Sequence, residues 1–556
     1  MSAAAEQPAS YPLLQLPDAM ADGPMGDAKL FGGPGIILMP ARGLEGLQCL
    51  NGWQPDHGDM LFPLTLPSMS FRSWAKVLAC MPGIKASELQ QARGNVRSGT
   101  MPVHNPMLLA DAQRRALAYL ENVTARSVYP DAAAIQGLKA FDEPLPDDPL
   151  APETTLRLLD EAGSPATVAS AGARYFGFVV GGSLPVALAA DWLISAWDQT
   201  ATMPVTSPTA AKLEAVASRW LLDILGLPAE SAVAFVTGAS IGNLLGLAAA
   251  RHHLLRRVGY DVEAQGLFGA PPLRVVASAE IHSTLIKVLG ILGLGRSRIE
   301  TVETDAQGRL IPDRLPPLDD RTIVCIQAGN VNSGSFDPFR DVIARARTAG
   351  AWVHVDGAFG LWAGASAKTR HLVDGIDGAD SWVTDGHKWL NVPYDCGMIA
   401  CRHPEALRGA MGLTAAYMLS SEEIPAKDLG PEFSRRARGI TVWAALRTLG
   451  RTGVADLVDR CCAHARRMAE GLRALGFDIH NDVVLNQIVA SFGDAAQTAR
   501  IQALVEQDGT CWFGPTQWRG RPAVRISISS WATGDGDIDA ALAAIGRAVD
   551  TMRATS

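Results

Sequence analysis

The chain has 556 residues, of which 48% are hydrophobic and 19% are charged, and its formal net charge is -8 at pH 7. This composition is typical of a soluble globular protein with a sizeable core, and it excludes a chain that is disordered throughout. The acidic balance, without a long run of Lys or Arg, argues against nucleic acid as a partner. No apolar run approaches the roughly 20 residues that cross a bilayer, so no membrane segment is expected.

The eight cysteines show no C-x-x-C spacing and no clustered histidine. This pattern argues against a metal site and favours reduced cysteines that pack as small hydrophobic residues. The opening MSAAAEQPASYPLL lacks the basic segment and apolar block of a signal peptide. We therefore predict a cytoplasmic protein without a bound metal.

The N-terminal part of the chain changes character near residue 105. Residues 1–105 are rich in Gly, Pro and Met without a sustained period, which predicts a poorly ordered or extended segment. Apolar residues at helical spacing in MPVHNPMLLADAQRRALAYLENV predict the start of a helical arm and linker over residues 106–165. Because Met101 stands just before the change, an over-extended reading frame that truly starts there is an alternative, which sequencing of the protein N-terminus would decide.

From residue 166 onward, strand patterns alternate with helix patterns. SAVAFVTGAS precedes IGNLLGLAAARHHLLRR, and TIVCIQAGN precedes FDPFRDVIARARTAG. Such alternation predicts an α/β fold with a mostly parallel, doubly wound sheet, which we assign to a large domain over residues 166–415. Long helices followed by short strands predict a smaller C-terminal α+β domain over residues 416–556. Ligands of a doubly wound sheet bind at the carboxyl ends of its strands.

Three features lie at predicted strand ends. Asp356 ends the apolar strand WVHVDG, Lys388 follows the short strand in ADSWVTDGH, and Gly238, Ala239 and Ser240 open a helix in VTGASIGN. Each has an ordinary structural explanation: a turn or helix cap for Asp356, a snorkelling side chain for Lys388, and plain capping for the small residues. Burial would lower the pKa of the lysine and give a nucleophilic amine.

Together these features specify a ligand with a phosphate, an aldehyde carbon and a ring that takes a carboxylate partner. Small residues at a helix N-terminus allow backbone N–H groups to reach a phosphate. A lysine amine forms a Schiff base with an aldehyde, and a carboxylate pairs with a ring nitrogen. Pyridoxal 5′-phosphate has all three groups, so it is the predicted cofactor.

At HVDGAFG and DGHKWLNVPYDCG the chain resembles the group II pyridoxal-phosphate-dependent decarboxylases of fold type I, which include aromatic-L-amino-acid and glutamate decarboxylases. The resemblance extends over roughly residues 110–545. It implies that Lys388 forms the Schiff base, that Asp356 pairs with the pyridine nitrogen, and that Ala239 and Ser240 contact the phosphate. It also implies a homodimer with its sites at the subunit interface.

The resemblance assigns further residues to the site. His282 matches the histidine that stacks over the cofactor ring, Ala358 a small residue beneath the ring, and His387 the histidine before the lysine. Tyr417 resembles a loop tyrosine that returns a proton after CO₂ loss, although a packed core tyrosine is an equal alternative. Arg525 stands where an arginine recurs in the family, and it either binds a substrate carboxylate or supports the fold.

Two segments depart from the family pattern. Family members often have Asn-Pro before His-Lys, whereas this chain has Asp385 and Gly386. Because a carboxylate beside a phosphate is repulsive, we expect Asp385 to point away and leave Thr384 or backbone groups to hold the phosphate. A Thr-rich loop of the family is replaced by QAGNVNSGSFD, in which Asn330 and Asn332 are candidates for hydrogen bonds near the phenolic oxygen of the cofactor.

These residues predict the decarboxylation of an L-amino acid, a small-molecule substrate, to an amine and CO₂. Aminotransferases, aldehyde-forming deaminases and carbon-carbon lyases use the same lysine and aspartate and are the nearest alternatives. A non-catalytic cofactor-binding protein on the same fold is a further one. Tyr175, Phe176 and Phe178 in ARYFGFVVGGSLP mildly favour an aromatic or apolar substrate side chain.

Overall fold

The computed structural model describes residues 36–39, 60–63, 105–412 and 425–554. Most of the segment predicted to be extended, and Tyr417, lie outside these residues. The chain divides into two units, Met1–Pro106 and Met107–Ser556. In the first unit, β1 (Ile36–Met39) and β2 (Met60–Pro63) form an antiparallel pair.

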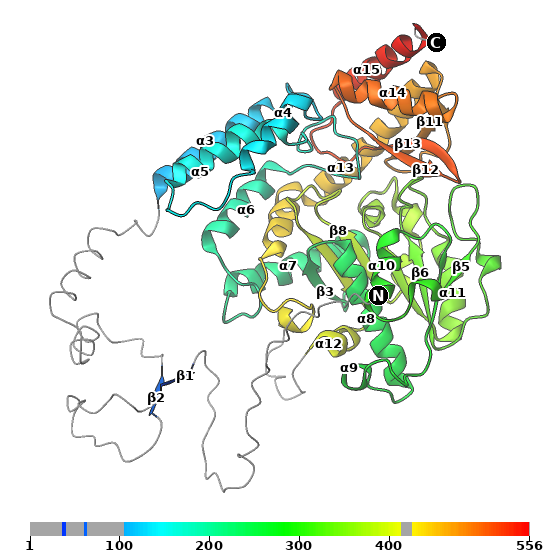
Figure 1. Ribbon diagram of the computed structural model, residues 1–556. Helices are drawn as coiled ribbons and strands as arrows, with labels where there is room; N and C mark the ends of the chain where they lie inside the picture. The colour runs from blue at the N-terminus through cyan, green and yellow to red at the C-terminus, as the bar shows by residue number, and fades with distance from the viewer. Residues whose placement is uncertain (1–35, 40–59, 64–104, 413–424, 555–556) are drawn as a thin grey trace, which may run out of the picture. The chain divides into compact units, whose positions relative to one another are not determined.

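The second unit is built around a seven-stranded sheet with the order β3-β9-β8-β7-β6-β4-β5 (Figure 1). Its strands are β3 (Ala232–Val236), β4 (Arg274–Ser278), β5 (Ile299–Val302), β6 (Thr322–Gln327), β7 (Trp352–Asp356), β8 (Ser381–Asp385) and β9 (Gly397–Cys401). Every neighbouring pair from β8 to β5 is parallel, and β9 is antiparallel to both of its neighbours. The predicted mostly parallel sheet is therefore confirmed.

Both faces of this sheet are buried. On β6, Ile323 and Cys325 join one hydrophobic core, while Val324 and Ile326 join the other. This division follows from the period of two along a strand, which turns successive side chains to opposite faces. The first core contains α8 (Ala239–Arg257), α10 (Ser283–Ile291) and α12 (Pro404–Met411), and the second contains α7 (Pro208–Leu225) and α11 (Phe339–Ala349).

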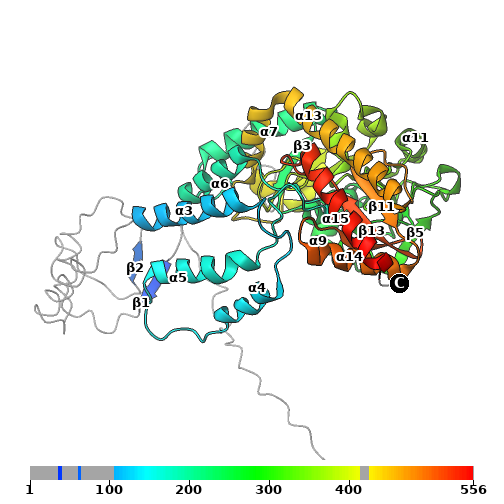
Figure 2. The same ribbon diagram turned by 90° about the horizontal axis from the view of Figure 1, so that it is seen from above.

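The predicted helical arm begins with α3 (Pro106–Asn122). It continues through α4 (Ala132–Gly137), a 3₁₀ turn (Leu138–Phe141), α5 (Pro152–Leu158) and a π-helical turn (Leu159–Gly163). Figure 2 shows α3, α4 and α5 near one another at one side of the remaining helices and sheets. None of the residues of α3 is buried. The arm is followed by α6 (Pro185–Trp197), which packs against the long helix α13 (Arg438–Leu475).

The C-terminal part contains the predicted α+β arrangement. The two long helices expected there are the two halves of α13 (Arg438–Leu475), which meet at a non-helical residue, Gly450. A four-stranded antiparallel sheet has the order β10-β11-β13-β12. Its strands are β10 (Asp478–Ile479), β11 (Gln487–Ser491), β12 (Gly514–Trp518) and β13 (Arg521–Ser527). The helix α14 (Ala495–Asp508) packs against β12 and β13, and α15 (Asp535–Ala554) packs against α13 and α14.

None of the helices in the described parts of the chain combines the length and the apolar character needed to cross a bilayer. The described residues also contain no group of three or more His, Cys, Asp or Glu side chains arranged to hold a metal ion. The six cysteines among them are all buried and unpaired with one another.

Two ion pairs connect α7 to α13 and to the residues just before α13, and one pair is buried while the other is exposed. Arg435 donates two hydrogen bonds to Glu214, at 2.9 and 2.5 Å, and the two side chains are only 5% and 10% exposed. Burial raises the pKa of Glu214, and the Arg435 guanidinium opposes that change. Arg451 and Asp223 also form an ion pair, but both side chains are more than half exposed.

Replacing Arg435 with Met should destabilise the protein by about 3–5 kcal/mol, because it leaves a buried carboxylate without its partner. Replacing Arg451 with Met should cost about 0–1 kcal/mol, because water screens an exposed pair. Urea unfolding of both variants measures the two free energies. Equal losses would show that burial does not decide the contribution of the Arg435–Glu214 pair.

Candidate functional site

A cavity of about 410 Å³ opens at the carboxyl ends of the parallel strands. Its walls come from the carboxyl ends of β6, β7 and β8, the segments that follow β3, β4, β6, β7 and β8, the segment of Phe178 and Val179 before α6, and one side chain of β13. The lining residues include Phe178, Gly238, Ala239, Ser240, His282, Thr284, Gln327, Gly329, Val331, Asp356, Ala358, Asp385, His387, Lys388, Tyr394 and Arg525. The cavity thus collects most of the predicted site residues from distant parts of the sequence.

Asp356 is the last residue of β7 and is 6% exposed. One carboxylate oxygen accepts a hydrogen bond from the backbone N–H of Ala358 at 3.2 Å, and the other accepts one from Asn243 Nδ2 at 3.2 Å. A buried carboxylate needs such donors, because an unpaired one is costly. Asn243 was missed by sequence reasoning, although a polar residue on the buried side of an otherwise apolar helix is a usable signal.

Lys388 lies in the turn after β8, and its Nζ is 3.1 Å from Asp385 Oδ2. The other oxygen of Asp385 accepts a hydrogen bond of 2.6 Å from the backbone N–H of Ala239, at the first turn of α8. The expectation that Asp385 points away from the anion site is therefore wrong. A helix N-terminus favours a negative charge, and here Asp385 supplies it.

Thr384 does not reach the cavity, so its prediction as a phosphate contact is wrong. Its hydroxyl donates to the carbonyl of Ala358 at 3.4 Å, and its side chain lies on the opposite face of the sheet among residues of α7. The reason is the alternation along β8, which turns Thr384 and Asp385 to opposite faces.

Asn330 is likewise turned away from the cavity, and its prediction as a cofactor contact is wrong. Its Oδ1 accepts hydrogen bonds from the backbone N–H groups of Asn332 and Ser333, at 2.9 and 3.1 Å. Asn332 in turn bonds to Thr516 at 2.7 Å. These asparagines shape the loop after β6, since Asn side chains readily bond to backbone groups two or three residues ahead.

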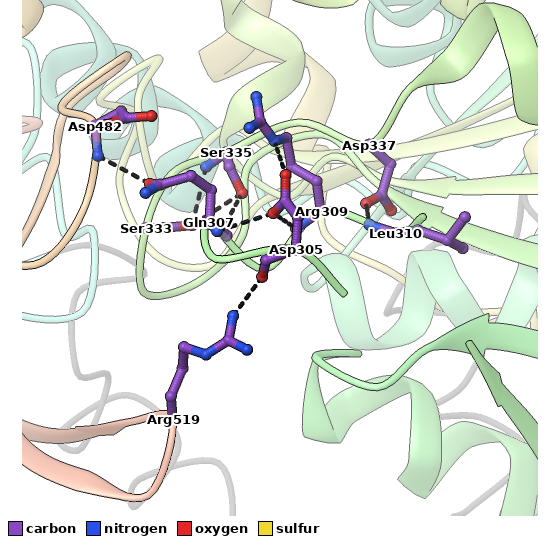
Figure 3. A network of polar contacts seen from close by, with 9 residues as sticks. All are labelled: Asp305, Gln307, Arg309, Leu310, Ser333, Ser335, Asp337, Asp482 and Arg519. Atoms are coloured by element: carbon purple, nitrogen blue, oxygen red, sulfur yellow. Dashed lines mark hydrogen bonds and ion pairs between the residues drawn. The ribbon is translucent and has the colours of Figure 1, made fainter. Parts of the chain in front are cut away.

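A polar network braces the same loop (Figure 3). The hydroxyls of Ser333 and Ser335 both donate to the carbonyl of Gln307, each at 2.7 Å. The buried carboxylate of Asp337 accepts from the backbone N–H of Leu310 at 2.8 Å. Burial raises the pKa of Asp337 to about 6. The network holds the part of this loop that lines the cavity.

Two histidines of the cavity have depressed pKa values because of burial. His282 precedes α10, where its Nδ1 accepts a hydrogen bond from the backbone N–H of Thr284 at 3.3 Å. His387 Nδ1 accepts from the backbone N–H of Cys396 at 3.1 Å, and its ring stacks on Tyr394 with 4.3 Å between the ring centres. Tyr394 was missed as a site residue, although it lies inside the DGHKWLNVPYDCG motif.

Arg525 reaches the cavity from β13. Its Nη1 donates to the carbonyl of Val331 at 3.0 Å, and its guanidinium lies 5.8 Å from the ring centre of Phe178. Burial lowers its pKa, and within the described part of the chain no carboxylate pairs with it. Of the three aromatic residues expected near the substrate, only Phe178 lines the cavity, because Tyr175 stacks on Trp512 and Phe176 is buried.

This sheet, with polar groups of several strand ends around one cavity, defines an α/β protein that binds a cofactor and a small molecule there. The family model described as "Pyridoxal-dependent decarboxylase conserved domain" matches residues 166–492, which is more than half of the chain. The chain therefore belongs to the pyridoxal-dependent decarboxylase family, and its fold is that of the fold type I enzymes.

Similar proteins include several amino-acid decarboxylases. The aromatic-L-amino-acid decarboxylase of Bacillus atrophaeus is 29% identical over 314 residues, which are 54% of this chain and 62% of that protein. Tryptophan decarboxylase 1 of Oryza sativa subsp. japonica is 29% identical over 324 residues, with the same coverage of 54% and 62%. The acidic amino acid decarboxylase GADL1 of Bos taurus is 26% identical over 314 residues, 54% of this chain and 59% of that protein. The match thus spans less than two thirds of each relative.

Solved structures show the same fold. The Oryza sativa TDC structure with PLP and tryptamine has a TM-score of 0.75 at 23% identity and covers 81% of this chain and 99% of that one. Mouse CSAD has a TM-score of 0.73 at 22% identity, with coverage of 80% and 98%. Rhodiola rosea 4-hydroxyphenylacetaldehyde synthase has a TM-score of 0.72 at 22% identity, with coverage of 81% and 99%.

The cavity fits pyridoxal phosphate, the cofactor of the family. Asp356 offers a carboxylate for a ring nitrogen, and Lys388 offers an amine for an aldehyde. The carboxylate of Asp385 accepts a hydrogen bond from the backbone N–H of Ala239 in the first turn of α8, which shows that an anionic oxygen fits there. Ser240 is exposed in the same turn and Ala358 leaves space beside the ring position. Tyr417 lies outside the described residues, so its assignment stays a prediction.

Proposed function

We propose that this protein removes the α-carboxylate of an L-amino acid as CO₂, with pyridoxal phosphate bound in the cavity. The observation that carries the proposal is the convergence of Lys388, Asp356, the N-terminus of α8 and Arg525 on one cavity. These groups match, in turn, an aldehyde, a ring nitrogen, a phosphate and a substrate carboxylate. A site that only stored the cofactor would have no use for Arg525.

When bound, the cofactor supplies the electron sink for the bonding electrons of the leaving carboxylate. Lys388 would hold the cofactor through its aldehyde carbon. Asp356 would pair with the protonated ring nitrogen, and an ion pair at about 4 Å with an effective dielectric near 20 is worth about 4 kcal/mol. His282 borders the cavity beside them, where its neutral ring can pack on a flat ligand.

Replacing Lys388 with Ala should reduce CO₂ release from an amino-acid panel by about a thousandfold or more, because the covalent attachment point is lost. The absorbance of the lysine-bound cofactor should disappear as well. Lys368→Ala is a matched control, because that side chain is 76% exposed.

The products identify the reaction type in the same assay. CO₂ with the amine supports decarboxylation, whereas aldehyde with ammonia would assign an oxidative deamination. Retention of the absorbance in Lys388→Ala would rule out this lysine as the attachment point.

We also propose that Arg525 binds the α-carboxylate of the substrate. It is a mostly buried cation on the cavity wall, and its described polar contact is one backbone carbonyl. A charged hydrogen bond to a carboxylate is stronger than one to a neutral acceptor, so a carboxylate ligand would fill the remaining donors of the guanidinium.

Replacing Arg525 with Met should raise the KM for amino acids by about 10- to 100-fold, the loss expected for hydrogen bonds to a charged group. The inhibition constant of the amine product should change little, because the amine has no α-carboxylate. Arg521→Met, on an exposed position of the same strand, is the control. If only substrates with an acidic side chain were affected, Arg525 would be assigned to the side-chain carboxylate instead.

We propose a homodimer as the assembly. The helix α3 has no buried residue, and its apolar side chains Met107, Leu109 and Leu117 are 76%, 65% and 45% exposed. Leu109 and Leu117 lie eight residues apart and so on neighbouring sides of α3, where a second copy of the chain would cover them.

Analytical ultracentrifugation should give twice the chain mass, and the double variant Leu109→Glu, Leu117→Glu should shift the protein toward monomer by placing charges in the contact. A dimer unaffected by both charges would place the interface elsewhere, and a monomeric wild type would overturn the proposal.

A further inference from the structure

A chain of buried hydrogen bonds leads away from the cavity behind Asp356. Asn243 donates to Asp356 Oδ2 at 3.2 Å, and its own Oδ1 lies 2.8 Å from His354 Nε2. His354 Nδ1 lies 2.8 Å from Ser381 Oγ, and Trp352 Nε1 donates to that same hydroxyl at 3.0 Å. Three elements, the helix α8 and the strands β7 and β8, are thereby connected to one carboxylate.

Every bond of this chain runs in one direction. The indole of Trp352 can only donate, so the hydroxyl of Ser381 accepts from it. Because a neutral His354 that donates from Nε2 to Asn243 Oδ1 has an acceptor at Nδ1, the hydroxyl of Ser381 donates to that Nδ1. The other ring nitrogen of His354 then carries the proton and donates to Asn243. The amide of Asn243 turns its oxygen to His354 and its NH₂ group to Asp356, since a carboxylate can only accept.

The charge state of His354 agrees with this direction. Its side chain is completely buried, and burial lowers its pKa to about 4. The imidazole is therefore neutral at pH 7, with one donor and one acceptor nitrogen. We call the hydrogen-bonded residues Asn243, His354, Ser381 and Trp352 the relay. Because His354 is neutral, the relay places no second buried charge near Asp356, and such a charge would be costly.

The helix α8 is shaped to admit this histidine. A Cβ atom on Gly246 would lie 2.5 Å from His354 Cε1 and 2.6 Å from its Nδ1, so any larger residue would push the ring out of the chain. Glycine in the middle of a helix is destabilising relative to alanine, so the space for the histidine ring is gained at the expense of helix stability. Asn243 and Gly246 are three residues apart and share the face of α8 that lies over β7.

We propose that Asn243, His354, Ser381 and Trp352 are positioning residues that hold the carboxylate of Asp356 oriented toward the cavity. This inference rests on the proposed function, in which Asp356 partners the ring nitrogen of pyridoxal phosphate. Hydrogen bonds donated to a carboxylate favour its charged form. A carboxylate held in this orientation would pair with the ring nitrogen of the bound cofactor.

The closer a relay residue lies to Asp356, the more its substitution should disturb the orientation of the Asp356 carboxylate. Asn243 touches Asp356 directly, His354 acts through it, and Ser381 and Trp352 act through His354. Loss of a nearer link leaves fewer donors aligned toward the carboxylate. A purely structural role would give losses that follow packing volume instead, with Trp352 the largest.

The holoenzyme tests the proposal through the protonation of its cofactor. Pyridoxal phosphate labelled with ¹⁵N in the ring is bound to the wild type and to Asn243→Leu, His354→Phe, Ser381→Ala and Trp352→Phe. We expect the ring-nitrogen shift to move toward the unprotonated value, most in Asn243→Leu and least in Trp352→Phe. The cofactor dissociation constant should rise about tenfold in the first two variants, the lower end for removing a group that orients a ligand-binding residue.

Val353→Ala is the matched control for lost packing. Val353 is 1% exposed on the same strand, and its side chain joins the other core, away from the relay. It should lower stability and leave the ring-nitrogen shift unchanged. The mild variants Ser381→Ala and Trp352→Phe keep the test decisive where a nearer variant does not fold.

Asp356→Asn separates the two hypotheses. If it moves the ring-nitrogen shift and the relay variants do not, the relay is overturned and the role of Asp356 stands. If Asp356→Asn itself leaves the shift unchanged, Asp356 is not the partner of the ring, and both the relay and that part of the proposed function are overturned. A shift in Val353→Ala as large as in His354→Phe would also overturn the relay.

Discussion

The site depends on a constraint set by the sheet. Six of its seven strands run in one direction, and helices bury both faces, so polar side chains inside the strands have little access to water. Charged groups are tolerated at the carboxyl ends of the strands, because there they can contact water and the backbone groups of the loops. Asp356 and Asp385 both end a strand, and Lys388 follows one. The geometry of the sheet therefore decides where the chemistry can occur.

The sequence was sufficient to predict the mostly parallel sheet and many of the residues that flank the cavity, although not Tyr394. Long apolar runs such as TIVCIQ mark buried strands, and a lone carboxylate or lysine at the end of such a run marks the ligand side. The positions of Asp356 and Lys388 followed from this reasoning, and the DGHKWLNVPYDCG motif added the resemblance to a family. The sequence therefore predicted the order of strands and helices along the chain and the polar residues at the strand ends.

Side-chain orientation was not available in the same way. All residues of β8 are buried, so SWVTD shows no alternation of polar and apolar residues that would tell which side chains face α8. Thr384 and Asp385 were consequently assigned to each other's sides. Asn243 and Tyr394 were missed for a different reason. Asn243 contacts Asp356, which is far away in the sequence, and the ring of Tyr394 stacks on that of His387, and a periodic pattern reports neither contact. Asn330 was misassigned because a loop asparagine serves its own backbone as readily as a ligand.

The two carboxylates of the cavity differ in what they already bind, and this difference assigns their roles. Asp385 pairs with the ammonium of Lys388 and with the N-terminus of α8, so its charge is compensated by the protein itself. Among the residues that the structure describes, those that donate hydrogen bonds to Asp356 are an amide and a backbone N–H, neither of which carries a full charge. A buried carboxylate whose hydrogen-bond donors are neutral is further stabilised by a nearby cation. Asp356 is therefore the carboxylate that would attract a protonated ring, while Asp385 holds the lysine in place beside it.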